Sequence, residues 1–125
     1  DIGLAYPLAA SVTYACCMSA RELGMPEAQI PLANATVMLA TSPKSNSAYK
    51  AAAAAHEDIQ RGLGTAIPEH LQSPLFKGYK YPHDYPGHYV KQQYLPIDLV
   101  GRRYYVPADN KTETAAAEYA KKVKG

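Results

Sequence analysis

The sequence predicts a mainly α-helical domain with an irregular segment rich in tyrosine and proline, which holds one small β-hairpin. Three observations indicate this class. Apolar residues recur at helical spacing through the first half, five consecutive alanines stand at 51–55, and prolines interrupt the stretch 77–107. A length of 125 residues suits one domain over 1–125, and an apolar share of 47% excludes a disordered chain.

Two helices are predicted before residue 42. Pro7 suits the first position of a helix, and Gly24 suits its end. One stripe between them has helical spacing and is expected to face the core: Leu8, Val12, Ala15, Ser19 and Leu23. The second helix, from Pro26 or Pro31 to Thr41, is apolar on more than one face, which indicates burial between neighbours.

A third helix is predicted to start near Ser42 or Ser45 and to end at Gly62. Its expected inner stripe consists of Ala48, Ala52, Ala55, Ile59 and Leu63. A last helix is expected to begin at Asn110, because Asn110 and Glu113 have the spacing of a capping box. The lysines near its end suit the negative pole of a helix.

Seven of the eleven tyrosines fall between residues 77 and 107. Short strands are predicted over 90–95 and 102–106, separated by the stretch 96–101. Four prolines prevent any longer element here: Pro82, Pro86, Pro96 and Pro107. The expected result is a structured loop with at most one hairpin.

Charge and cysteine content exclude several classes. The formal net charge of +2 is too small to indicate a nucleic-acid-binding protein by itself. The only cysteines, Cys16 and Cys17, point about 100° apart on a helix, so they are expected to pack as small apolar residues in a reducing compartment. The uncharged run 2–20 favours a buried helix over a membrane span or a signal peptide. Because the chain starts at Asp1 without an initiator Met, it is expected to be part of a longer protein.

No motif predicts a catalytic residue, a cofactor site or a metal site. The phosphate-binding pattern GxxxxGK[ST] is absent, and the GLG string at 62–64 has the features of a helix end. His83, Asp84 and His88 are spaced too loosely for a metal site, so a hydrogen-bonded loop is expected there. Other serines and histidines lack a glycine elbow or a recognisable partner: Ser42, Ser45, Ser47, His56 and His70.

The segment 77–105 is the best candidate for an interaction, because tyrosines alternate there with basic residues. Five basic residues exceed two aspartates, for a local excess of +3. The candidate DNA contacts are Lys77, Lys80, Lys91, Arg102 and Arg103. Such a surface suits single-stranded nucleic acid, through stacking and phosphate contact, and it suits a protein interface equally. In a third interpretation, the tyrosine rings only cover a small helical core.

Three strings stand out together: DIGLA at 1–5, SPKSNSAY at 42–49, and YPHDYPG at 81–87 followed by QYLP at 93–96. In this order they resemble the C-terminal domain of the replication-associated recombination protein A family. These are the bacterial maintenance-of-genome-stability AAA+ ATPases, related to the Werner-helicase-interacting protein. The resemblance extends to Pro107 and leaves out the tail after Ala108. The stretch 71–79 is shorter than the family's usual loop, so contacts made through that loop stay open.

The resemblance implies a parent protein of the clamp-loader type, in which ATP and Mg²⁺ bind upstream of this chain. The C-terminal domain is similar to a clamp-loader collar and builds a homotetramer. The implied activity is DNA-stimulated ATP hydrolysis at stalled forks in DNA replication, repair and recombination, alongside single-strand-binding protein. It also implies a cytoplasmic, nucleoid-associated protein without a membrane partner, and a chain that has no enzymatic activity on its own.

Two function classes follow. In the first, the chain is an oligomerisation domain, and the candidate interface residues are Ala53, Ala54, Tyr81, Tyr85 and Tyr89. In the second, it is itself a nucleic-acid-binding module that contacts single-stranded DNA through the segment 77–105. Local charge favours the first class, because a dedicated DNA-binding module concentrates more basic residues than an excess of +3.

Overall fold

The computed structural model describes residues 1–125 and contains four α-helices and five short 3₁₀ helices, with no β-strand. The predicted mainly α class is therefore confirmed, and the predicted β-hairpin is wrong. The chain divides into two compact units, each with its own internal contacts. The first comprises Asp1–Ala48 and Pro107–Ala116, and the second comprises Tyr49–Val106 and Ala117–Gly125.

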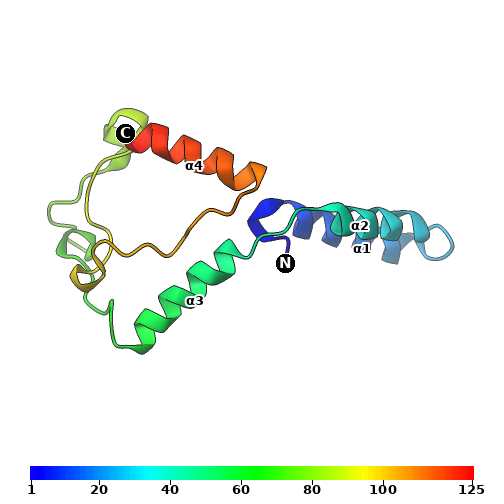
Figure 1. Ribbon diagram of the computed structural model, residues 1–125, viewed down its shortest axis with the longest axis horizontal. Coiled ribbons are helices and arrows are strands. Elements are labelled where there is room, and N and C mark those ends of the chain that lie inside the picture. Colours follow the sequence, from blue (N-terminus) through cyan, green and yellow to red (C-terminus); the bar gives the residue numbers. More distant parts are fainter. The chain divides into compact units, whose positions relative to one another are not determined.

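The first unit is built on a helical hairpin. α1 (Ala9–Leu23) and α2 (Gln29–Thr41) run antiparallel and lie side by side (Figure 1). α1 ends at Gly24, as the sequence predicts, and the φ of 69° at this residue favours glycine. Pro31 lies in the first turn of α2, where its missing N–H costs no helical hydrogen bond.

Small side chains form the contact between α1 and α2. Ala9 and Ala35 are buried, and the other positions with the same helical spacing are half-buried: Thr13, Cys16, Ala20, Pro31, Met38 and Ser42. The stripe that was expected in the core is outside, because Leu8 is 61% exposed and Leu23 is 56% exposed. That prediction is wrong for a packing reason. Short side chains let two helices approach closely, which leaves the longer ones on the outer faces.

Backbone hydrogen bonds join the N-terminal residues to the loop after α2. The Ser45 N–H donates to the carbonyl oxygens of Asp1 (2.9 Å) and Ile2 (3.1 Å). Gly3 begins the 3₁₀ helix η1 (Gly3–Ala5) with a φ of 51°, and a Cβ there would lie 2.7 Å from the Ser45 carbonyl oxygen. Only glycine fits this approach, so the DIGLA and SPKSNSAY strings form one structural feature.

In the second unit, α3 (Ser47–Gln60) contributes the residues from Tyr49 onward. Its inward side carries Asp58, which is only 6% exposed, and three half-buried alanines, Ala51, Ala54 and Ala55. The predicted inner stripe is wrong for Ala48, Ala52 and Ile59, which are exposed (Ile59 62%), whereas Ala55 and Leu63 are half-buried. The reason is a polar anchor, because Tyr104 donates a hydrogen bond to the Asp58 carboxylate, which apolar periodicity cannot reveal.

The GLG string ends α3, as predicted. Gly62 has a φ of 81°, and its N–H donates to the Ile59 carbonyl oxygen at 2.9 Å. Gly64 donates its N–H to the Asp98 carboxylate, 3.0 Å from Oδ2. A Cβ at Gly64 would lie 2.8 Å from Leu99, the buried apolar residue of this unit. The string therefore anchors η5 (Ile97–Leu99).

No strand forms over 90–95 or 102–106. The short 3₁₀ helix η2 (Glu69–Leu71) precedes the segment 77–107, which itself contains η3 (Pro82–Asp84) and η4 (Pro86–His88). A side chain takes the place of a partner strand. The Gln92 amide donates to the Lys80 carbonyl oxygen (2.7 Å) and accepts from the Lys80 N–H (3.2 Å). The backbone is thus satisfied locally, and the neighbouring prolines lack the N–H that a ladder requires.

The tail forms α4 (Lys111–Lys124). The Glu113 N–H donates to the Asn110 side-chain oxygen at 2.9 Å, which confirms the predicted helix start. Three lysines occupy the last turn, as expected. None of the helices has both the length and the apolar character needed to cross a membrane.

Candidate interaction surfaces

α2 is the only one of the four α-helices without a charged side chain. Several of its large apolar residues are exposed: Ile30 (69%), Leu32 (43%), Val37 (61%) and Leu39 (36%). Its hydroxyls are satisfied internally, because Thr36, Thr41 and Ser42 each donate to the carbonyl oxygen four residues earlier at 2.6–2.8 Å. The outer surface of α2 is therefore largely apolar, and its hydroxyl groups need no hydrogen bonds from water.

Exposed apolar side chains lie on both sides of the hairpin, and Tyr14, Leu32 and Leu39 are on the side of the groove described below. We call the other face, with its exposed apolar side chains, the ridge. On each helix they stand about one residue before the positions that contact the other helix. One residue corresponds to about 100° of rotation, and the helices are antiparallel, so these positions share a side of the hairpin. The ridge consists of Leu8, Val12, Ala15, Ser19, Leu23, Ile30, Ala33, Asn34 and Val37, all exposed and none charged.

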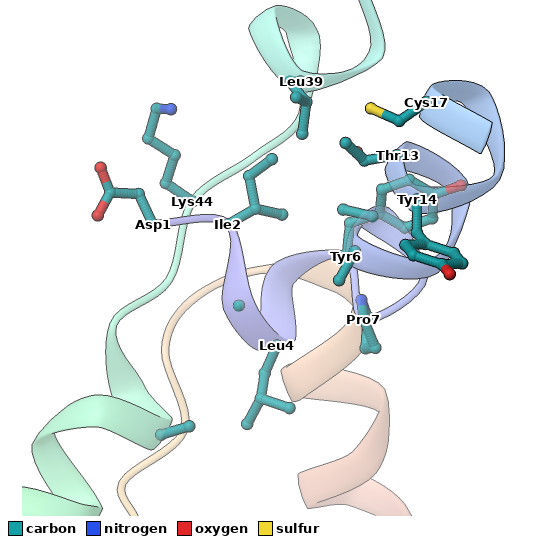
Figure 2. A pocket seen from close by; sticks show the side chains of 14 residues that line it. Asp1, Ile2, Leu4, Tyr6, Pro7, Thr13, Tyr14, Cys17, Leu39 and Lys44 are labelled. Carbon is teal, nitrogen blue, oxygen red and sulfur yellow. The ribbon is translucent and has the colours of Figure 1, made fainter. Parts of the chain in front are cut away.

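The opposite face of the hairpin holds a groove of about 880 Å³. Its lining is mostly apolar and includes Ile2, Tyr6, Ala10, Thr13, Tyr14, Cys17 and Leu39. Figure 2 shows Ile2, Cys17 and Leu39 directed into the groove, with Asp1 and Lys44 at its edge. The first unit thus presents two different apolar surfaces, a ridge and a groove.

A buried carboxylate fastens the start of α4 to the loop after α2. Glu113 is only 1% exposed, and it accepts hydrogen bonds from Ser45 Oγ (2.6 Å), from Ser47 Oγ and from the Asn110 amide. Thr112 adds a bond to the Ala5 carbonyl oxygen (3.2 Å). Two of the three serines of the SPKSNSAY string, Ser45 and Ser47, are buried and donate to Glu113, so they form a clasp between the two segments.

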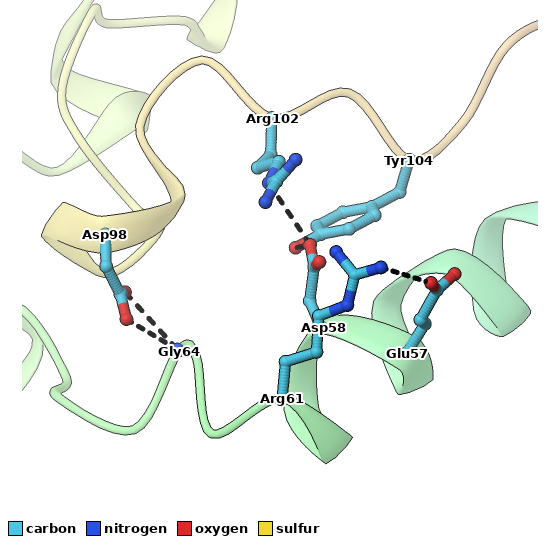
Figure 3. Close-up of polar contacts among 7 residues, drawn as sticks. All are labelled: Glu57, Asp58, Arg61, Gly64, Asp98, Arg102 and Tyr104. Carbon is cyan, nitrogen blue, oxygen red and sulfur yellow. Dashed lines mark hydrogen bonds and ion pairs between the residues drawn. The ribbon is translucent and has the colours of Figure 1, made fainter.

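A second buried carboxylate organises the second unit (Figure 3). Asp58 Oδ2 accepts a hydrogen bond from the Tyr104 hydroxyl (2.7 Å) and lies 3.2 Å from Arg102 Nε. The hydrogen bond to Asp58 raises the pKa of the Tyr104 phenol above its ordinary value, and burial and the negative charge of Asp58 act in the same direction. This cluster holds the segment at 102–104 against α3.

The candidate DNA contacts fall into two groups. Arg102 is paired with Asp58, and Lys77 lies 3.9 Å from Glu69 in an exposed ion pair. Lys80, Lys91 and Arg103 are exposed and make no ion pair. Fewer basic side chains are therefore available to phosphates than the sequence count suggests.

The tyrosines of the segment do not form one patch. Tyr81 is 53% exposed, Tyr85 is 37% exposed and Tyr89 is half-buried. The rings of Tyr81 and His83 are tilted by 47° with centroids 5.0 Å apart, and those of His83 and His88 by 48° with centroids 4.8 Å apart. The two histidines of the loosely spaced His-Asp-His pattern thus lie in ring contact, and no group of three potential metal ligands occurs in the chain.

The two alanines predicted at an interface differ in exposure. Ala53 is exposed, whereas Ala54 is half-buried on the inward side of α3. Sequence reasoning missed Glu113 and Asp58 as anchors. A signal existed for Glu113, since a capping-box residue close to a serine-rich string has hydroxyl donors to accept from. No comparable signal marks Asp58, whose partners lie far along the chain.

This geometry defines a helical domain with a hairpin whose second helix is uncharged and with carboxylate-anchored segments. The chain belongs to the MgsA AAA+ ATPase C-terminal family, whose model matches residues 1–124. The match corrects the sequence interpretation at one point. The tail after Ala108 lies within the family's domain, and Glu113 shows how it is attached.

Named relatives support the same assignment. A replication-associated recombination protein A of Bacillus subtilis is 45% identical over 86% of this chain and 28% of its own length. An uncharacterised AAA domain-containing protein of Mycobacterium tuberculosis is also 45% identical, over 86% of this chain and 26% of its own length. The Escherichia coli replication-associated recombination protein A is 31% identical over 94% and 29%. The chain spans less than a third of these relatives.

Proposed function

We propose that this chain is the self-association domain of an AAA+ ATPase of replication-associated recombination and that it assembles four subunits in the manner of a clamp-loader collar. ATP and Mg²⁺ belong to the remainder of the parent protein, and this chain supplies assembly. DNA contact in replication and repair belongs to the full-length protein, with single-strand-binding protein as a further partner.

The observation that carries the proposal is α2, an uncharged helix with exposed Ile30 and Val37. A helix that is apolar all round is normally buried among neighbours. Within the chain, α2 packs chiefly against α1. Ala53 on α3 and the exposed Tyr81 and Tyr85 are further candidate contacts for a second interface.

Light scattering on the chain tests the proposal. We expect a mass near four times 13.6 kDa at high concentration. Ala53→Glu places a charge on exposed α3 and is expected to lower that mass to a dimer, because an unpaired charge opposes burial in an interface. A wild-type chain that stays at 13.6 kDa at every concentration contradicts self-association.

A second candidate function, single-stranded DNA binding, is favoured by one observation. The contacting rings of Tyr81, His83 and His88 lie in an exposed segment close in sequence to Lys80 and Lys91. Aromatic rings beside basic side chains suit stacking of bases and contact with phosphates. With three unpaired basic residues, we expect this binding to be weak.

A further inference from the structure

We draw no further inference here: the strongest candidate, the apolar groove of about 880 Å³ beside α1 with Asp1 and Lys44 at its edge, carries none because nothing in the structure shows what covers it.

Discussion

The α1–α2 hairpin and α3 differ in which side chains they expose and which they pair within the chain. On the hairpin, large apolar residues such as Ile30 and Val37 are exposed, while the hydroxyls of α2 bond to their own helix. On α3, the exposed side carries charges such as Glu57, which pairs at 2.8 Å with Arg61 just after the helix end, and the inward side buries Asp58 against partners from the same chain.

The difference indicates which region of the chain is satisfied by its own contacts and which region leaves apolar surface for a partner to cover. α3 and the segment at 102–104 have their polar groups paired within the chain, so they need no further partner to be stable. On the hairpin, the hydroxyls of α2 are bonded, whereas the buried Thr13 hydroxyl of α1 has no hydrogen-bond partner. The hairpin also leaves apolar surface in water, where burial contributes about 25 cal/mol for each Å² removed. The hairpin is thus the region that gains most from a second protein.

The largest expected effect is on the clasp that holds the first unit together. Glu113→Ala leaves the hydroxyls of Ser45 and Ser47 buried without their carboxylate acceptor, and we expect a loss of about 3 kcal/mol in the free energy of unfolding. Urea denaturation measures this loss. Glu118→Ala, at an exposed position of the same helix, is the matched control and should change stability by less than about 0.5 kcal/mol. Equal stabilities of the two variants contradict the clasp.

The corresponding anchor of the second unit is expected to contribute less, because Arg102 is half-exposed and water can solvate it. Asp58→Ala should lower the free energy of unfolding by about 1–2 kcal/mol. The neighbouring Glu57→Ala removes only an exposed ion pair and should cost about 0.5 kcal/mol or less. If both changes cost the same, α3 is not anchored through Asp58.

Added salt should have opposite effects on self-association through the ridge and on DNA binding through the segment 77–105. Association through an uncharged ridge is expected to persist or to strengthen in sulfate, which favours apolar burial. Binding of single-stranded DNA through Lys80, Lys91 and Arg103 should weaken as salt rises, because binding releases counterions from the phosphates, and three basic residues should give a shallow dependence. Light scattering and fluorescence anisotropy, measured across the same salt series, check both. An assembly that dissociates in high salt is held by charges and not by the ridge.

The smallest effect concerns Tyr104 at high pH. The folded state raises the pKa of this phenol above its ordinary value of about 10, chiefly through the hydrogen bond to Asp58. Its contribution to stability is therefore fully present below pH 10 and is lost as pH rises through the raised pKa. Stability measured between pH 8 and pH 11 should fall more steeply for the wild type than for Tyr104→Phe. If stability falls equally with pH in the wild type and in Tyr104→Phe, the hydrogen bond from Tyr104 to Asp58 does not contribute in this way.

Local signals predicted the helices well, whereas packing decided the rest. Gly24, Gly62 and Asn110 marked helix ends correctly, because glycine conformation and side-chain capping act over a few residues. Apolar periodicity located stripes but could not say whether a core or another molecule covers them. For this reason Leu8 and Val12 were expected inside. The predicted hairpin over 88–106 is absent, and the Gln92 side chain bonds the Lys80 backbone there, a contact that local sequence signals do not reveal.

Whether a second copy covers the ridge is tested most directly by hydroxyl-radical footprinting of the chain at low and high concentration. We predict that Leu8, Ile30 and Val37 are labelled at low concentration and become protected as the mass rises, whereas Tyr14 on the groove face stays labelled throughout. Ridge residues that remain equally labelled while the mass increases would show that other surfaces join the subunits.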